Sequence, residues 1–363
     1  MVSRGDPVLH IIYPHRDRIS CPDAIGHNLV EFFSKRVKVR AYELNEPRRI
    51  EPARGDVLLG HPSPAWWSPF RRCLGDARWS RRIAVFPFVH TDYRQCSFFD
   101  SMAPRCDEVL TITGHYWFST AARSRYAHWV PRMKHLDLAI DRRHFPFVKT
   151  GFRKPGERRF LYIGHGAWMK NVPYLNRIAE RRPNWTFAWI GETKSRHRHL
   201  QCLGSHDFSK EAARALVAEH DFLICTSTAD ANPTTILEAM SWGLIPVCTP
   251  TCGYDHEAGI PNIPLDDVDG AIEILERLQH LDEADLRQMQ RHNLQRLQDH
   301  YNWERFCGQV SDSVFGTETA PMPRQSFTNA LVLRAASMAS PYAPFRYRSL
   351  QRSLRRRFLG TRR

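Results

Sequence analysis

Residues 228–250 read TADANPTTILEAMSWGLIPVCTP, a polar loop followed by an apolar helix pattern and a short strand. Gly243 separates the helix pattern from the strand at 245–248. Asp230 lies in the loop before the helix, and Glu238 is expected two turns inside it. The stretch therefore predicts a loop–helix–strand unit of an α/β domain with two carboxylates near one helix start.

The start of this helix suits a phosphorylated ligand. The first amide groups of a helix have no partner within it, and the helix dipole is positive at this end. Carboxylates accept hydrogen bonds from sugar or ribose hydroxyls. Phosphate and polyol together indicate a nucleotide-sugar, whereas the alternative is an ordinary helix–Gly–strand unit whose acids serve solubility.

The composition is that of a globular chain long enough for two domains. The 363 residues are 42% hydrophobic and 25% charged. No run of about 18 apolar residues and no apolar signal core occur, so we expect a cytoplasmic protein. Nine scattered cysteines without a CxxC pair indicate neither a disulfide framework nor a zinc site. Cys248, Cys252 and His256 could be half a metal site, but we expect no metal.

Two halves of the chain repeat short apolar runs separated by helix-length segments. Those of the first half lie at 8–13, 37–42, 56–60, 83–89 and 108–112, with a helix near 25–33. Those of the second lie at 160–164, 186–191, 222–225 and 245–248, with a helix at 172–181 and two C-terminal helices. Such runs are typical of buried parallel strands, so each half is expected to be a doubly wound sheet.

The predicted domains follow from a linker rich in Gly, Pro and charge at 149–159. We expect a first Rossmann-like domain at 1–150, a second at 151–316 and a basic tail at 317–363.

Residues 228–250 resemble the donor-binding motif of the retaining glycosyltransferases of family 4, in which two Glu residues lie eight positions apart. Asp230 takes the place of the first Glu, and Glu238 that of the second. Residues 138–145, LAIDRRHF, resemble the end of the family's first domain, with Ala139 in a Gly position. The similarity covers roughly residues 155–315 and, more weakly, 1–150. It implies the GT-B fold, with an N-terminal acceptor domain and a C-terminal nucleotide-sugar donor domain facing each other across a cleft.

The resemblance also implies a donor site. Lys170 ends the loop GHGAWMK at 164–170 and takes the place of the family's phosphate-binding Lys. His165 replaces the Arg that usually accompanies this Lys, and a neutral His is a weaker clamp on a diphosphate. Glu238 would accept both ribose hydroxyls. Asp230 would meet the donor sugar, closer or through a water, because Asp is shorter than Glu.

Further positions carry weaker signals. Asn232, Thr234 and Thr235 would direct amide and hydroxyl groups at the sugar and phosphates. Gly164 and Gly191 lie in turns after predicted strands, and Gly191 with Glu192 resembles the family's Gly-Asp-Gly turn, although Thr193 replaces the second Gly. Residues 203–204 resemble the segment against which the nucleobase packs; all of these could instead be plain turns.

The first half contributes His90 and Asp92, which follow a predicted strand. The family often carries a His here, near the donor sugar and the acceptor, and His90 could donate to a sugar hydroxyl or the reacting face; alternatively it caps the next helix. With Lys170 and Asp230 it completes the expected catalytic set. Residues 14–17, with 26–28 expected to open a helix, replace the family's Gly-rich acceptor loop without its Gly pair.

The expected reaction is the family's: front-face attack on the donor, with the leaving diphosphate helping to remove the acceptor proton and no metal or cofactor required. The acceptor stays open between a glycan, a lipid-linked and a small molecule. We expect a role in bacterial polysaccharide or glycoconjugate synthesis.

The C-terminal tail holds much of the chain's positive charge. Of the net charge of +14, residues 317–363 supply +9, from ten Arg and one Glu, which leaves +5 for the rest. Apolar residues recur at three, four and four in 345–359: Tyr347, Leu350, Leu354 and Phe358. This predicts a basic amphipathic helix on an anionic membrane, at the inner face, or else a solvated tail.

Two other functions remain open. A degenerate, non-catalytic nucleotide-sugar-binding protein is favoured by the replacements at Asp230 and His165. A nucleic-acid-binding protein would use the Arg-rich tail, but the rest of the chain has no recognised module, and we expect no nucleic-acid partner.

Overall fold

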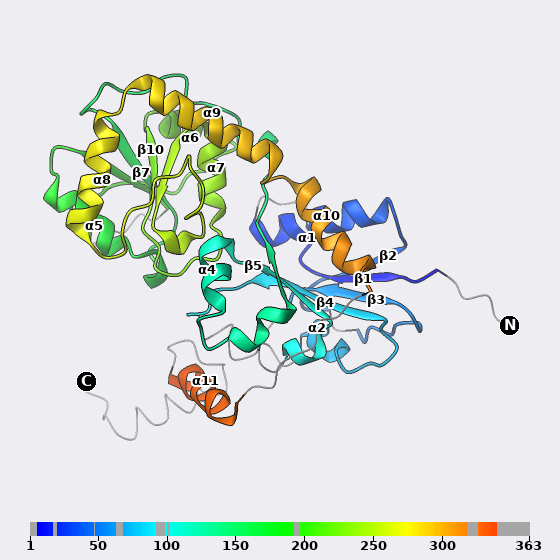
Figure 1. The fold of residues 1–363 in the computed structure, drawn as a ribbon. Helices are drawn as coiled ribbons and strands as arrows, with labels where there is room; N and C mark the ends of the chain where they lie inside the picture. Colours follow the sequence, from blue (N-terminus) through cyan, green and yellow to red (C-terminus); the bar gives the residue numbers. More distant parts are fainter. Residues whose placement is uncertain are drawn as a thin grey trace, which may run out of the picture. The chain divides into compact units, whose positions relative to one another are not determined.

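The computed structural model describes residues 6–16, 20–46, 48–62, 68–91, 99, 102–191, 197–317 and 326–339. They belong to two compact units, each built around one sheet (Figure 1). The first unit falls within Met1–Thr111, Thr120–Lys134 and Ser311–Arg363, and the second within Ile112–Ser119 and His135–Val310. The predicted tail helix at 345–359 lies outside the described residues, and so do Asp17, Asp92, Glu192 and Thr193.

The sheet of the first unit has six strands in the order β2-β1-β3-β4-β5-β6. Strand β1 lies between β2 and β3 and pairs with both in parallel. The strands are β1 (Leu9–Ile12), β2 (Val39–Tyr42), β3 (Val57–Gly60), β4 (Arg81–Pro87), β5 (Glu108–Ile112) and β6 (Met133–Leu136). The helical segments that accompany them are α1 (Cys21–Ser34), α2 (Pro69–Cys73), η1 (Ala103–Arg105), η2 (Ala127–Arg132) and α11 (Phe327–Ala339). Helices α4 (Gly114–Ala121) and α10 (Trp303–Phe315) have residues in both units, and most residues of each belong to the second.

Helix α1 starts earlier than predicted. Ser20 precedes it and a Pro lies in its first turn, where a missing amide hydrogen costs nothing. Ile25, Leu29 and Phe33 recur every four residues and are buried. Gly26 therefore lies inside the helix, and the prediction that residues 26–28 open it is wrong. A Cβ at Gly26 would lie 1.8 Å from the carbonyl oxygen of Pro14, so only glycine lets α1 approach the loop after β1.

The sheet of the second unit has five strands in the order β11-β10-β7-β8-β9, and every neighbouring pair is parallel. The strands are β7 (Arg159–Ile163), β8 (Thr186–Ile190), β9 (Gln201–Gly204), β10 (Phe222–Cys225) and β11 (Ile245–Cys248). The α-helices are α5 (Val172–Arg181), α6 (Glu211–Ala218), α7 (Thr234–Trp242), α8 (Val268–His280) and α9 (Glu283–Asp299). Short 3-10 turns are η3 (Arg142–His144), η4 (Trp168–Lys170) and η5 (Pro250–Cys252).

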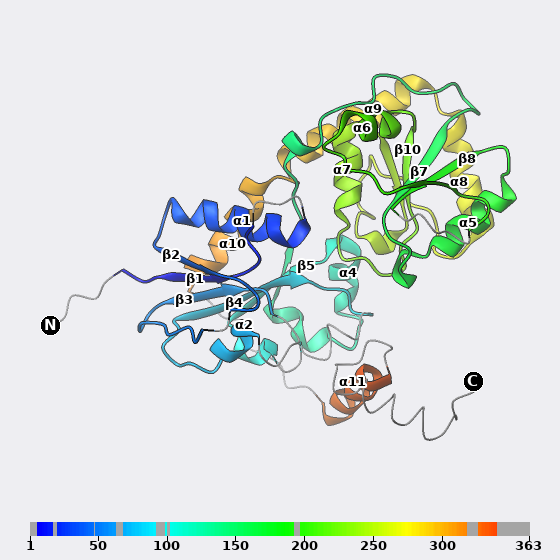
Figure 2. The ribbon, with the colours of Figure 1, turned by 180° about the vertical axis from the view of Figure 1, so that it is seen from behind.

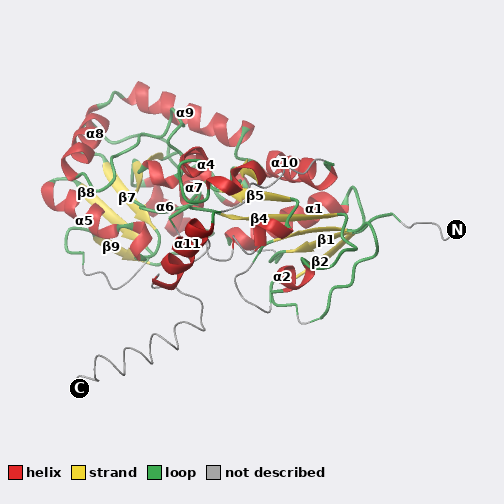
Figure 3. Cartoon of the chain, turned by 60° about the horizontal axis from the view of Figure 1, so that its bottom comes forward, coloured by secondary structure: helices red, strands yellow, loops and turns green. Residues whose placement is uncertain are grey.

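Aromatic side chains fill the centre of this second sheet. Phe160 stacks on Phe187 and Phe222 with ring centroids 4.9 and 5.2 Å apart, and all three are buried. Helices α5 and α8 contribute to the same apolar core, and α7 contacts β10, β11 and α9. Helices thus flank the strands of this unit, as Figures 2 and 3 show. Every strand predicted for the two halves is confirmed.

Helix α7 begins at Thr234, directly after Pro233. Glu238 is its fifth residue and lies about one turn inside it, since a turn takes about 3.6 residues. The expected two turns are wrong. Gly243 ends the helix with φ +89°, and a Cβ there would lie 2.4 Å from the Phe147 ring. Among the described residues, no helix combines the length and apolar character needed to cross a bilayer.

Candidate active site

The strand order of the second sheet reverses between β7 and β10, and the loops after these two strands meet at the carboxyl edge. Such a reversal is where open α/β sheets bind ligands. The Thr226 hydroxyl donates to the carbonyl of Lys170 at 3.1 Å, and the Thr228 amide donates to that of Met169 at 2.7 Å. These bonds tie the loop of residues 164–170 to the loop of residues 226–233.

Lys170 and Asp230 form an ion pair between these two loops. Lys170 Nζ donates to Asp230 Oδ2, which also accepts a 3.3 Å hydrogen bond from the Ser227 hydroxyl. Each of the two charged side chains is 17% exposed. Burial by itself would lower the pKa of Lys170, but the Asp230 charge outweighs burial and the net pKa is raised. Lys170 is therefore a fixed positive charge beside a carboxylate.

The first turn of α7 lies next to this pair in sequence. Thr234 and Thr235 are its first two residues, and helix-start amides have no partner inside the helix. Asn232 is buried, and its Oδ1 accepts the Leu138 amide at 2.8 Å. Asn232 Nδ2 is also buried and has no hydrogen-bond partner among the described residues. A buried unsatisfied amide is costly, so a ligand acceptor there would gain from it.

Glu238 has a carboxyl group with a strongly perturbed pKa. Burial raises the pKa of Glu238 to about 7, and a hydrogen bond with Thr234 opposes that rise. Burial therefore favours the neutral form of the Glu238 carboxyl group. Perturbed carboxyls of this kind concentrate at functional sites. Two hydroxyl donors on a ligand would favour the ionised form.

Two glycine turns shape the edge beside Lys170. Gly164 and Gly191 have φ of +148° and +145°, and a Cβ at Gly191 would lie 2.1 Å from the Gly164 carbonyl oxygen. His165 is exposed, and its Nδ1 accepts the Ala167 amide at 3.2 Å. Nδ1 therefore carries no proton in this arrangement, and Nε2 is the nitrogen that can face an anion.

Trp117 is a site residue that sequence reasoning missed. Its Nε1 donates to the carbonyls of Asp230 and Thr251 at 2.8 and 2.9 Å, and the side chain is buried. It belongs to α4 and lies 113 positions from Asp230, so no local pattern connects them. The indole fixes the backbone that carries the Asp230 carboxylate.

His90 belongs to the first unit, where it follows β4. Its Nε2 lies 2.9 Å from the Thr120 hydroxyl, and burial lowers the pKa of His90. The strand order of this sheet reverses between β1 and β3, which Tyr13 and His61 follow. Their rings meet edge to face with centroids 5.4 Å apart, and burial lowers the pKa of His61 to about 4. His61 is a second residue that the sequence patterns did not single out.

Solved structures with a similar fold include glycosyltransferases. Sucrose-phosphate synthase from Thermosynechococcus elongatus matches with a TM-score of 0.63 and 12% identity, over 86% of this chain and 100% of that one. HepE from Anabaena, solved with UDP and glucose, matches with a TM-score of 0.57 and 12% identity, over 85% of this chain and 99% of that one. An α-glucosyltransferase solved with UDP and a 13-mer DNA matches with a TM-score of 0.56 and 12% identity, over 85% of this chain and 99% of that one.

No protein-family model matches the chain, and no curated protein is similar to it in sequence. The structural matches define the class of fold: two parallel sheets of six and five strands flanked by helices, as in GT-B glycosyltransferases. The predicted GT-B fold is therefore confirmed. Identities of 7–12% extend this likeness to the fold and no further.

Proposed function

We propose that this chain is a retaining glycosyltransferase that moves a sugar from a nucleotide-sugar to an acceptor hydroxyl, without a metal or an organic cofactor. The Lys170–Asp230 pair at the strand-order reversal supports this most directly, because it combines a phosphate-binding cation and a hydroxyl-binding carboxylate. The UDP bound in HepE and in the α-glucosyltransferase supports a nucleoside-diphosphate donor.

The donor diphosphate would lie between Lys170 and the start of α7. The Lys170 ammonium group would interact with the phosphate oxygens partly in place of Asp230. The amides of Thr234 and Thr235 would donate hydrogen bonds to the same oxygens. His165 Nε2 would add a weaker contact from the Gly164 turn, across from Gly191. These groups stabilise the negative charge that develops as the glycosidic bond breaks.

The sugar and ribose would use the two carboxylates. Ionised Glu238 would accept both ribose hydroxyls, which compensates the cost of charging a buried group. Asp230 would accept a donor-sugar hydroxyl once Lys170 turns to the diphosphate, and Asn232 Nδ2 would donate to another sugar oxygen. Donor binding would thus give the buried Asn232 Nδ2 an acceptor and the Glu238 carboxylate two donors.

In the transfer step the acceptor oxygen bonds to the anomeric carbon on the face that the diphosphate leaves. The carbon–oxygen bond to the phosphate breaks, and the acceptor proton passes to the departing diphosphate oxygen. Burial lowers the pKa of His90, and as a neutral imidazole His90 would exchange a hydrogen bond with a hydroxyl of the acceptor. We propose a glycan, lipid-linked or small-molecule acceptor.

A non-catalytic nucleotide-sugar-binding protein is the second candidate, because Asp230 and His165 replace stronger groups. A panel of nucleotide-sugars, beginning with UDP-sugars, separates the two. We expect one donor to raise the melting temperature and mass spectrometry to detect its nucleoside diphosphate. Binding without release would identify the non-catalytic protein, and no binding by any donor would refute both.

The matched variants are Glu238→Ala and Glu211→Ala. Glu211 is exposed at the start of α6 and has no proposed role. Glu238→Ala should reduce donor turnover by at least about 100-fold, because the ribose would lose two hydrogen bonds to a charged group, each of about 1.5–3 kcal/mol. Glu211→Ala should leave turnover unchanged. Equal turnover of the two variants would contradict the proposed ribose contact.

A further inference from the structure

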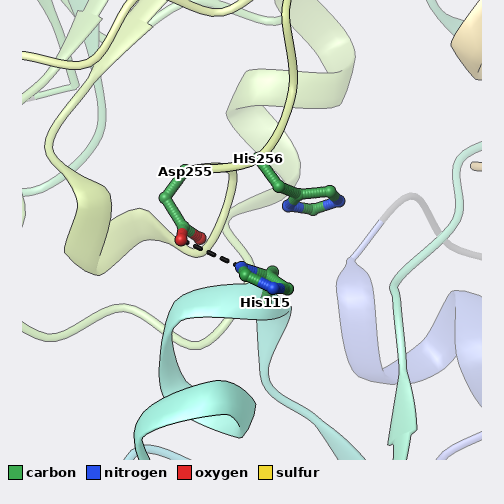
Figure 4. A group of neighbouring side chains, drawn as sticks. All are labelled: His115, Asp255 and His256. Carbon is green, nitrogen blue, oxygen red and sulfur yellow. Dashed lines mark hydrogen bonds and ion pairs between the residues drawn. The ribbon is translucent and has the colours of Figure 1, made fainter.

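Three side chains with metal-binding chemistry meet within the second unit: His115, Asp255 and His256. Each offers one ligand atom, and these atoms all lie within 4.8 Å of one another. His115 is the second residue of α4, whereas Asp255 and His256 follow η5 (Figure 4). His115 Nδ1 and Asp255 Oδ2 are 2.9 Å apart although 140 positions separate them in sequence. The cluster has no role in the proposed sugar transfer.

The backbone holds the two segments of the cluster close together. Gly114 and Gly253 adopt φ of +64° and +89°, and a Cβ on Gly114 would lie 2.6 Å from the Gly253 Cα. The His115 amide donates to the Gly253 carbonyl at 2.9 Å. Since neither glycine tolerates a side chain, the separation of the three ligand residues is built into the backbone.

One oxygen of the cluster lacks a partner. Asp255 Oδ1 is buried and accepts no hydrogen bond from the described residues. An unpaired buried carboxylate oxygen is costly, and a cation would compensate it. His115 and His256 stay solvent-accessible, with ring centroids 4.7 Å apart, which leaves an entry path for an ion.

An outer carboxylate orients His256. His256 Nε2 lies 3.3 Å from Glu257 Oε1, and that oxygen also accepts hydrogen bonds from Arg296 at 2.7 Å and Tyr301 at 2.6 Å. Metal-binding histidines usually donate their second ring nitrogen to such a carboxylate. Nδ1 is then the nitrogen of His256 that a metal would take.

We propose that His115, Asp255 and His256 bind a divalent transition-metal ion, with zinc as the best match to two imidazoles and one carboxylate. Tetrahedral zinc with bonds of about 2.0–2.2 Å places its ligand atoms about 3.4 Å apart. The three ligand atoms lie within 4.8 Å of one another, and bound zinc would hold them at that closer spacing. Water would complete the coordination.

The ion would act on the position of the loops rather than on the reacting bond. It would join the start of α4 to the segment after η5, and Trp117 of the same helix holds the Asp230 and Thr251 carbonyls. A metal at this site would therefore steady the backbone that carries Asp230. Metal binding at this cluster does not require the proposed transferase activity.

Zinc titration calorimetry on the chelator-treated full chain tests the site. We expect one site in the unaltered chain, with affinity reduced more than about tenfold by His115→Ala, His256→Ala or Asp255→Asn, since even outer-shell changes cost about 10–100-fold. Zinc should raise the melting temperature of the unaltered chain and not that of the variants.

His280→Ala is the matched control, because His280 is an exposed histidine of α8 outside the cluster. It should keep the full affinity for zinc. Circular dichroism verifies that each variant is folded. If His115→Ala does not fold, His256→Ala tests the zinc site through the segment after η5. Equal zinc affinity in the unaltered chain, His115→Ala and His256→Ala would overturn the site, as would weak binding at many sites that every variant shares.

Discussion

The two sheets of this protein use the same parallel strand–helix construction but place different chemistry at their strand-order reversals. In the second sheet the reversal between β7 and β10 is followed by the charged pair Lys170 and Asp230. In the first sheet the reversal between β1 and β3 is followed by Tyr13 and His61, which meet through their rings. The fold supplies the position, and the residues after the strands decide what binds there.

The two sheets also bury titratable groups of opposite behaviour. Glu238, beside the second reversal, has its pKa raised, and His61, beside the first, has its pKa lowered. Burial is the largest cause of both shifts, because it disfavours whichever form is charged. Both groups are therefore stabilised as neutral, yet their contributions to stability change with pH in opposite directions.

We expect the replacement of Lys170 to have the largest effect on catalysis. Lys170→Ala should lower the rate of nucleoside-diphosphate release by about 10³-fold, because the cation that stabilises the leaving group is lost and Asp230 is left unpaired. Lys210→Ala, at an exposed position before α6, should leave the rate unchanged. A loss below tenfold in Lys170→Ala would mean that Lys170 does not contact the diphosphate.

Glu238→Gln should lower activity and make the folded protein more stable at alkaline pH. The folded pKa of about 7 lies above the unfolded value of 4.5, so the contribution of Glu238 to stability is full below pH 4.5 and is lost as the pH rises through 7. At pH 8 the Gln variant should be more stable by about 1–3 kcal/mol, and at pH 4 equally stable. Urea unfolding at both pH values measures the free energies of unfolding of the two proteins. Equal values at pH 8 would show that ionised Glu238 carries no burial cost in the folded protein.

His61→Gln should show the opposite dependence in the first unit. The folded pKa of about 4 lies below 6.5, so the contribution of His61 is full above pH 6.5 and is lost as the pH falls through 4. Between pH 7 and pH 4 the unaltered chain should lose about 1–3 kcal/mol more than the variant. Urea unfolding again measures the difference, and parallel curves for the two proteins would contradict it. Donor binding should not change.

His165→Arg should strengthen UDP binding at the second sheet, with the smallest effect of the four substitutions. An Arg would supply the guanidinium that the resemblance to family 4 leads us to expect beside Lys170, and its fork suits phosphate oxygens. We expect UDP affinity to rise about two- to tenfold, as a surface-exposed charge-assisted contact contributes about 1 kcal/mol. His206→Arg, at an exposed position after β9, controls for added charge. An equal gain in both variants would point to non-specific attraction.

The central strands were predictable, whereas two edge strands were not. The predicted bounds of β10, β11 and α5 are those of the structure, because buried parallel strands and amphipathic helices have strong apolar patterns. β6 and β9 lie at sheet edges, and β9 has no buried residue. An edge strand half exposed to water needs few apolar residues, so its sequence carries little signal.

The functional division of the chain stays a prediction. The assignment of the acceptor to residues 1–150, of the donor to 151–316 and of membrane contact to 345–359 rests on sequence alone. The GT-B fold itself is confirmed.

Local sequence patterns were enough to predict the succession of strands and helices and the loop–helix–strand motif with Asp230 and Glu238. These features depend on spacing between near neighbours, which the chain carries locally. The tertiary structure alone decided that Lys170 pairs with Asp230, that Trp117 holds the Asp230 carbonyl and that His115 reaches Asp255. It also decided the pKa of Glu238. Contacts and burial of this kind come from segments far apart in the chain, and only folding brings them together.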